Sequence, residues 1–315
     1  MLRNSVIVLT ISLVTSLAAG TATAGAPAHP QYQWDRQPGQ SLSLGAGEKT
    51  LLSCHFGAEG GFPYFHPVAT PEGVPLTALA PPDHVWHRGI WFSWKYLNGV
   101  NYWDWAGRKN GVPDGLTQPD GKETVKIGPE GASLAMGLRY SSGDRSVLSE
   151  RRKISIGVPR DDGSYTMDWR LVFTAAGEDV VFERTPPAKA PWGGYGGLSF
   201  RGAKSLKKQR VIDSEGRQGK QGHGKQARWV DFSARTDNKG SAAGVAMFDH
   251  PDNPRHPSPW YISVGKMPYF NAAFLFAEPY TLPAEKSFTL RYRVLVHPGM
   301  GDPAALEKEY ESFAK

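Results

Sequence analysis

FTLRYRVLV, residues 288–296, decides the fold class of this chain. Its aliphatic and aromatic residues alternate with Thr289, Arg291 and Arg293, which is the period-two pattern of a strand with one buried face. Further runs rich in β-branched and aromatic residues lie between Gly, Pro, Asn and Asp clusters, at residues 51–56, 90–94, 133–140, 164–174, 228–234 and 242–248. This succession predicts an all-β fold, a large antiparallel β-sandwich.

The C-terminus has the one clear helical pattern. Asp302 is a good N-cap, Pro303 suits the first helical position, and Leu306, Tyr310 and Phe313 fall on one stripe. We expect a short C-terminal α-helix that packs this stripe against the sheet. Because the sequence contains no repeat and no low-complexity linker, we predict a single domain over residues 25–315, in preference to two domains.

Residues 1–24 have the pattern of an export signal. Arg3 gives a basic start, residues 6–19 are an apolar run, and Ala22, Thr23 and Ala24 form a small-residue cleavage site. The run is shorter than the roughly 20 residues that span a bilayer. We therefore expect a periplasmic or secreted protein that has no membrane anchor once the signal is removed.

Composition excludes several classes of protein. The 315 residues are 40% hydrophobic, too apolar for disorder, and their 36 Gly and 25 Pro are too many for a helical bundle. The single cysteine, Cys54, rules out an intrachain disulfide framework and thiolate-rich metal sites. We expect Cys54 to be a buried small hydrophobe and not a nucleophile.

The formal charge of +6 is concentrated in one segment. Residues 201–228 contain nine Lys and Arg against Asp213 and Glu215, a net of +7. The Gly-rich centre of this segment, residues 214–226, predicts a long exposed loop that is either a binding loop or a solvated basic loop without a partner. Nucleic acid is not predicted as a partner, because no aromatic residues interleave with the charge.

Half of the ten tryptophans fall within twenty residues. These are Trp86, Trp91, Trp94, Trp103 and Trp105, with His84, His87, Arg88, Asn98 and Asp104 among them. Aromatic faces beside hydrogen-bonding groups suit a sugar ring. A core strand with polar ends is the alternative, and strand alternation would put Trp91 on one face and Phe92 and Trp94 on the other.

Two histidine motifs depend on the local backbone. His84 and His87 would point to opposite faces of an extended chain, whereas a turn at residues 81–83 would bring them to one side. In DHPDNPRHPSPW, residues 249–260, prolines at about every third position favour polyproline II, with His250, Asn253 and His256 along one edge. His250 and His256 would then lie roughly 19 Å apart and could not share a metal unless the chain turned.

Four ordered motifs carry a resemblance to a known family. They are PYFHPVATPEGVPLT (residues 63–77), PPDHVWHRGIWFSWKYLNGVNYW (81–103), DSEGRQGKQGHGKQARWVDFS (213–233) and FDHPDNPRHPSPWY (248–261). Together they resemble the PmoA-like family, which carries the label methane oxygenase. The resemblance implies an exported all-β protein of glycan-degrading bacteria, with a fold similar to the supersandwich of galactose-mutarotase-like proteins. Because no segment after the signal reaches spanning length, membrane methane oxidation is not predicted.

The leading hypothesis is an exported carbohydrate-active enzyme that uses His and carboxylate acid-base chemistry, with hydrolysis, elimination and isomerisation left open. The candidate catalytic residues are His84, His87, Arg88, Glu215 and Asp104. The candidate substrate-binding residues are His66, Trp94, Asn98, Lys225, Arg228, His250, Asn253, Arg255 and His256.

Two alternatives remain open at this point. One is a non-catalytic carbohydrate-binding protein, in which the aromatic residues carry the affinity. The other, which we favour less, is a metal-dependent enzyme with His66, His84 and His87 as nitrogen ligands. No cofactor is predicted, the expected partner is a carbohydrate or other small molecule, and the oligomeric state is left open.

Overall fold

The computed structural model describes residues 31–57, 62–104, 114–237 and 239–315. The stretch from Gln31 to Lys315 forms one compact unit. The predicted export signal and Trp105 lie outside the described residues. Within the described ranges, no helix is long and apolar enough to cross a membrane.

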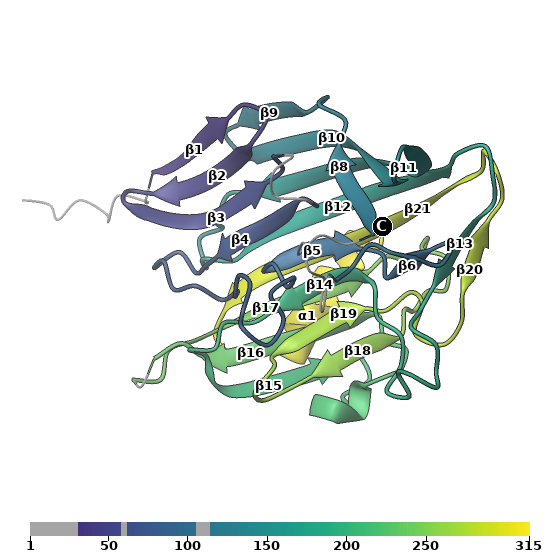
Figure 1. Ribbon diagram of the computed structural model, residues 1–315. Helices are drawn as coiled ribbons and strands as arrows, with labels where there is room; N and C mark the ends of the chain where they lie inside the picture. Colours follow the sequence, from purple (N-terminus) through teal and green to yellow (C-terminus); the bar gives the residue numbers. More distant parts are fainter. Residues whose placement is uncertain (1–30, 58–61, 105–113, 238) are drawn as a thin grey trace, which may run out of the picture. The chain divides into compact units, whose positions relative to one another are not determined.

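Three antiparallel sheets make up this unit (Figure 1). The first has the order β1-β2-β3-β4-β5-β14-β19-β18. Its strands are β1 (Tyr32–Gln37), β2 (Ser41–Ala46), β3 (Lys49–His55), β4 (Tyr64–Val68), β5 (Ile90–Ser93), β14 (Gly197–Arg201), β18 (Trp260–Ser263) and β19 (Tyr269–Ala272).

The second sheet has the order β15-β16-β17-β21-β12-β11-β10-β8, with β9 also paired to β10. Its strands are β8 (Gly115–Pro119), β9 (Thr124–Gly128), β10 (Gly131–Ser142), β11 (Arg145–Gly157), β12 (Tyr165–Ala175), β15 (Lys207–Asp213), β16 (Trp229–Arg235), β17 (Ala242–Asp249) and β21 (Ser287–Pro298). The small third sheet consists of β20 (Tyr280–Leu282), β13 (Val180–Glu183), β6 (Tyr96–Leu97) and β7 (Val100–Asn101).

The alternation in β21 sets the main core. Leu290, Tyr292 and Val294 are fully buried and belong to one hydrophobic cluster with residues of the first sheet such as Leu42 and Phe92. Each such side chain contributes about 1.5–3 kcal/mol by leaving water. The predicted all-β sandwich is confirmed, and each of the seven predicted strands corresponds to an observed one.

The predicted C-terminal helix is confirmed as α1 (Pro303–Phe313). The Asp302 carboxylate accepts a hydrogen bond from the backbone N–H of Ala305, which satisfies one of the free donors of the first turn. Leu306 and Tyr310 pack with apolar residues of β15, β16, β17 and β21 in a second hydrophobic cluster. This helix therefore covers part of the outer face of the second sheet.

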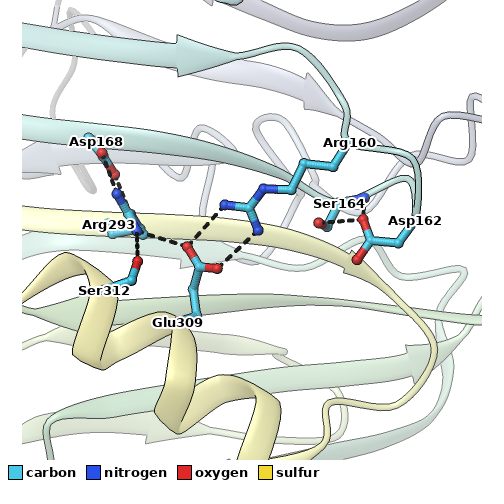
Figure 2. A network of polar contacts seen from close by, with 7 residues as sticks. All are labelled: Arg160, Asp162, Ser164, Asp168, Arg293, Glu309 and Ser312. Carbon is cyan, nitrogen blue, oxygen red and sulfur yellow. Dashed lines mark hydrogen bonds and ion pairs between the residues drawn. The ribbon is translucent and has the colours of Figure 1, made fainter.

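An ion-pair network fastens α1 to the sheet (Figure 2). Arg293 of β21 donates to both carboxylate oxygens of Asp168 at 2.7 and 2.8 Å, and to Glu309 of α1 at 2.8 Å. Arg160 donates to the same Glu309 at 2.9 and 3.2 Å. The two arginines hold the pKa of the Glu309 carboxyl below its usual value, although burial opposes them and is the largest single effect.

A second polar group is buried inside the sandwich. Arg152 and Glu150 of β11 both have fully buried side chains, and Arg152 Nε donates to Glu150 Oε1 at 2.6 Å. The Tyr140 hydroxyl donates to Glu150 Oε2 at 2.6 Å. Cys54 is also fully buried and its thiol is free, so the prediction of a small core hydrophobe is confirmed.

Candidate functional site

One cavity of about 190 Å³ is lined almost entirely by aromatic rings. We call it the aromatic cavity; its lining residues are His84, Trp86, His87, Trp103, Trp192, Tyr195, Tyr261, Met267 and Tyr269. They come from four separate parts of the chain: the turn before β5, the segment after β7, the loop before β14, and strands β18 and β19 with the loop between them.

The cavity lies over one face of the first sheet, from which Tyr261 of β18 and Tyr269 of β19 line it. Strand register places Trp91, Ser199, Asn271 and Tyr261 side by side on β5, β14, β19 and β18. Trp91 belongs to the hydrophobic cluster around the cavity, whereas Phe92 and Trp94 belong to the main core. The predicted alternation of these three residues is therefore confirmed.

A turn brings the two histidines together. The backbone N–H of His84 donates to Pro81 O, and that of His87 donates to His84 O, both at 2.9 Å. Their rings stack with centroids 4.5 Å apart. Gly89 ends the turn at φ +65°, where an added Cβ would lie 2.1 Å from the Phe65 carbonyl oxygen, so only glycine fits.

Glycines position the segment that carries Trp192 and Tyr195, which form another wall of the cavity. In WGGYGG, residues 192–197, Gly193 and Gly197 have φ values of +106° and +124°, and an added Cβ would lie 2.2 Å from the Phe276 ring and 2.3 Å from Ala272 O, respectively. This close approach of the backbone presents Trp192 and Tyr195 to the cavity.

His223 anchors this wall from the Gly-rich basic loop. Its Nε2 lies 2.6 Å from Trp192 O, and its Nδ1 lies 3.1 Å from the backbone nitrogen and 3.0 Å from the carbonyl oxygen of Ile262. Because a carbonyl oxygen only accepts, Nε2 carries the proton. The loop over residues 214–226 is thus ordered around a 3₁₀ turn, Gly219–Gly222, and contributes a structural histidine to the site.

Asp83 and Arg201 organise the polar side of the cavity. Arg201 Nη2 donates to both oxygens of Asp83 at 2.7 Å, and its Nη1 lies 3.4 Å from Nδ1 of His87. Since a guanidinium only donates, Nδ1 of His87 is the acceptor and Nε2 carries the proton. His84 Nδ1 lies 3.0 Å from Asp83 Oδ2, which makes Nδ1 the donor and leaves the Nε2 lone pair of a neutral His84 available as a base.

The two histidines differ electrostatically. His87 is 3% exposed, and its burial, together with the charge of Arg201 and that of His84 when it is protonated, lowers its pKa to about 2. Burial acts to raise the pKa of the Asp83 carboxyl, but hydrogen bonds from Arg201 and His84 and the charge of Arg201 outweigh it and lower that pKa to about 2. At neutral pH, His87 is therefore an uncharged hydrogen-bonding group and Asp83 is ionised.

The pKa of His87 predicts a loss of stability in mild acid. Below the ordinary histidine pKa of about 6.5, the unfolded chain binds a proton that the folded chain excludes. The free energy of unfolding therefore falls by about 1.4 kcal/mol per pH unit from this residue between pH 6 and pH 4. Urea unfolding of wild type and His87→Gln at several pH values measures this slope; parallel profiles would contradict the assignment.

Two further residues predicted from the aromatic segment, Asp104 and Arg88, are not among the lining residues of the cavity. Asp104 lies beside the cavity, where its Oδ2 is 2.5 Å from Lys95 Nζ, which in turn sits 5.6 Å from the Tyr195 ring centroid. Arg88 stacks over Phe62 and Tyr64 on the same sheet face.

His66, Trp94 and Asn98 do not line the cavity. His66 Nδ1 lies 3.0 Å from the Thr77 hydroxyl. Trp94 is fully buried in the main core, so its ring has no surface to offer a sugar. The Asn98 side chain donates to the carbonyl oxygen of Asp179 and accepts from the backbone N–H of Val181 in β13.

The residues predicted from the two polar loops lie elsewhere, away from the cavity lining. Glu215 is exposed and accepts from Ser214, and Arg228 pairs with Glu307 of α1 at 3.1 Å. Lys225 is exposed in a turn beside β18. The structure therefore does not bring Glu215 or Arg228 to His87, and the composite site expected from sequence is not formed.

The polyproline II prediction for residues 249–260 is wrong. The buried Asp249 carboxylate accepts hydrogen bonds from Asn253, His256 and the backbone of Ser258 at 2.7–2.8 Å, which folds this segment into turns. Asn253 also bonds the backbone of Arg291. This histidine and asparagine are structural.

The two remaining residues of that loop have structural partners as well. The His250 ring meets the edge of Phe313 at 5.0 Å. Arg255 donates to backbone carbonyls at residues 274, 278 and 279. In the part of the chain that the structure describes, no three His, Cys, Asp or Glu side chains are placed to hold a metal ion.

Sequence reasoning missed the wall of the cavity and the ion pair beneath it. Trp192 and Tyr195 carry a readable signal, two aromatic residues among four glycines. Arg201 belongs to the basic segment in the sequence, where nothing indicates its ion pair with Asp83. Tyr261 and Tyr269 reach the site through strand pairing, which the sequence does not display.

Comparison with known proteins gives one family match. The model of a family described as "Family of unknown function (DUF6807)" matches residues 41–311. The resemblance to the PmoA-like family is therefore wrong, and expectations that rested on it alone lose their support. No curated protein matches the sequence.

Several solved structures are similar at low identity. The galactosidase domain of alpha-galactosidase-sucrose kinase AgaSK has a TM-score of 0.40 and 9% identity over 85% of this chain and 42% of its own. Galactose 1-epimerase from Lactobacillus acidophilus NCFM has a TM-score of 0.38 and 8% identity over 86% and 100%. Alpha-galactosidase AgaA from Geobacillus stearothermophilus has a TM-score of 0.34 and 9% identity over 85% and 40%. This chain spans less than half of the first and third proteins, and scores this low carry no functional inference.

Proposed function

This chain belongs to the family of unknown function DUF6807, so its activity is inferred from its own site. We propose that the aromatic cavity binds a sugar ring and that its side chains transfer a proton to or from that sugar. The observation that carries the proposal is the pairing of an aromatic-lined cavity with a carboxylate-oriented histidine, Asp83–His84. Sugars present apolar C–H faces and hydroxyl groups, and this lining offers aromatic faces and polar atoms together.

His84 is the proposed base. Its Nδ1–H points to Asp83, so Nε2 accepts a proton from the sugar and the resulting imidazolium is stabilised by the adjacent carboxylate. The proton returns from the same nitrogen in the reverse transfer. The charge change is therefore confined to a residue whose side chain is 34% exposed at the edge of the cavity.

His87 is the proposed electrophilic partner. As a neutral imidazole with Nδ1 engaged by Arg201, it offers Nε2–H to a sugar oxygen on which negative charge develops. A neutral histidine in this role stabilises the oxyanion without losing its own proton.

The lining narrows the reaction class. Hydrolysis of a glycosidic bond ordinarily uses two carboxyl groups on either side of the bond. The described lining of the aromatic cavity has no Asp or Glu, and Asp83 is occupied by Arg201 and His84. We therefore favour isomerisation or elimination over hydrolysis. We also propose, on the pattern of residues 1–24, that the protein works outside the cytoplasm.

Trp192→Ala tests the location of sugar binding. Trp192 is 54% exposed, so its removal leaves the fold intact while deleting one aromatic face of the cavity. We expect about tenfold weaker binding of any sugar that the protein binds, since truncation of an anchoring Trp commonly costs more than 1 kcal/mol. Isothermal titration across a panel of mono- and oligosaccharides measures it.

Ile127→Ala is the matched control, because Ile127 is 51% exposed and lies on β9 of the other sheet. Its sugar affinity should equal that of wild type. Equal loss in both variants, or none in Trp192→Ala, would remove the aromatic cavity as the binding site.

A further inference from the structure

The outer face of the second sheet has a second, strongly charged region. Besides Arg152, whose side chain is buried, four basic residues line a hollow of about 420 Å³ where α1 does not cover this face, over β9–β12: Lys122, Arg151, Lys153 and Arg170. All four are exposed. We call this region the cationic hollow.

Strand register places these charges against one another. Lys153 of β11 lies directly opposite Arg170 of β12, and Arg170 lies directly opposite Arg291 of β21. Like charges in directly opposed positions destabilise a sheet. For Arg291 the repulsion is offset by an ion pair, since its Nη1 lies 2.8 Å from Asp252 Oδ2. Among the ion pairs of the described residues, none involves the four basic residues of the hollow.

The nearby carboxylates do not neutralise the hollow. Glu150 is held inside the sandwich by Arg152 and Tyr140. Asp120 lies at the edge, where its Oδ1 accepts from the backbone N–H of Lys122 and its side chain packs on Gly137. One carboxylate against four cations leaves a net positive surface.

Small residues shape the floor of the hollow. Ala135 and Gly137 of β10 stand opposite Lys153 and Arg151, so the cations rise from one side of a shallow floor. A Cβ added at Gly137 would lie 2.2 Å from Asp120 Oδ2, which shows how closely the edge wall approaches. A ligand with several spaced anionic groups can lie on such a floor.

We propose that the cationic hollow binds the sulfate or carboxylate groups of an acidic oligosaccharide. Guanidinium groups pair with these anions through two parallel hydrogen bonds, and lysine adds a point charge. Among the described residues, the lining of this hollow has no aromatic side chain on which a nucleic-acid base would stack, which disfavours single-stranded nucleic acid. This site lies on the opposite sheet from the aromatic cavity and does not depend on the function proposed for that cavity.

The test titrates the full chain with dextran sulfate, with oligogalacturonate and with neutral dextran at low and high ionic strength. We expect the anionic polymers to bind, neutral dextran not to bind, and salt to weaken binding. Which polymer binds more tightly identifies the anionic group as sulfate or carboxylate. Lys153→Gln/Arg170→Gln should bind at least about tenfold more weakly. Its melting temperature should equal or exceed that of wild type, because a like-charge contact is removed.

Lys220→Gln/Lys225→Gln is the matched control, with the same change of charge in the basic loop. It should bind within about twofold of wild type. Arg151→Gln is a second variant of the hollow and should also weaken binding. Failure of both polyanions to bind, equal binding of neutral dextran, or equal losses in the control and the hollow variants would overturn the proposal.

Discussion

His84→Gln is expected to abolish most of the turnover while leaving sugar binding in place. Glutamine keeps a hydrogen-bonding side chain of similar length, but it cannot take up the proton that Nε2 accepts. General-base catalysis by a positioned side chain contributes roughly 10²–10⁴-fold, so kcat should fall by that factor. Because the His84 side chain is 34% exposed, the fold should survive, which circular dichroism checks.

Asp83→Asn separates orientation of His84 from its chemistry. Asparagine can still contact Nδ1 of His84, but it removes the charge that stabilises the imidazolium and that pairs with Arg201. We expect kcat to fall less than in His84→Gln, with a shifted pH profile. If His84→Gln turned over sugars at the wild-type rate, His84 would not be the base.

Arg152→Ala is expected to cost the largest amount of stability. The side chains of Arg152 and Glu150 are fully buried, and Arg152 Nε and Nη2 donate to the Glu150 carboxylate at 2.6 and 3.0 Å. Removing one partner leaves an uncompensated charge in the core, which typically destabilises by about 3–5 kcal/mol. Burial is the main cause, with the charge of Glu150, that raises the pKa of the Tyr140 hydroxyl far above its usual value. Tyr140 therefore stays a neutral donor to Glu150 and cannot replace the positive charge of Arg152.

Arg151→Ala is the matched control, one residue away on the exposed face of the same strand. It should change the free energy of unfolding by no more than about 0.5 kcal/mol. Urea denaturation of both variants measures the difference. Similar losses in the two variants would contradict the inward orientation of Arg152.

Local sequence patterns predict the fold well because the alternation of apolar and polar residues has the same two-residue period as the side chains of a β-strand. Alternation in residues 288–296 places Leu290 and Val294 in the core and Arg293 outside, where it reaches Glu309 of α1. Asp302 and Pro303 mark the start of the helix for reasons confined to its first turn.

The site was only half predictable, because its other half depends on strand order. His84 and His87 could be proposed from their spacing and the preceding prolines, and the turn between them is local. Arg201 and Tyr269 reach them because β14 pairs with β5 and β19 in the first sheet. Such pairings join residues far apart in sequence, and no local pattern encodes them.

Proline spacing predicts the wrong conformation for residues 249–260 because it takes no account of the buried Asp249 carboxylate. Polyproline II has no internal hydrogen bonds. Asp249 supplies an acceptor at the centre of this segment, and three donors converge on it. These donors compensate the buried charge of Asp249 and fold the segment into turns. The loop that follows β17 then contacts α1, because His250 packs on Phe313 and His256 lies 3.4 Å from the Tyr310 hydroxyl.

If His84 moves a proton on a sugar held in the aromatic cavity, proton NMR of sugars in D₂O detects that transfer. Wild type is incubated with each sugar of the panel, and His84→Gln is run in parallel. We expect wild type alone to accelerate anomer exchange, deuterium incorporation at a sugar carbon, or formation of an unsaturated product on at least one sugar. Identical spectra and rates with wild type and His84→Gln across the panel would contradict it.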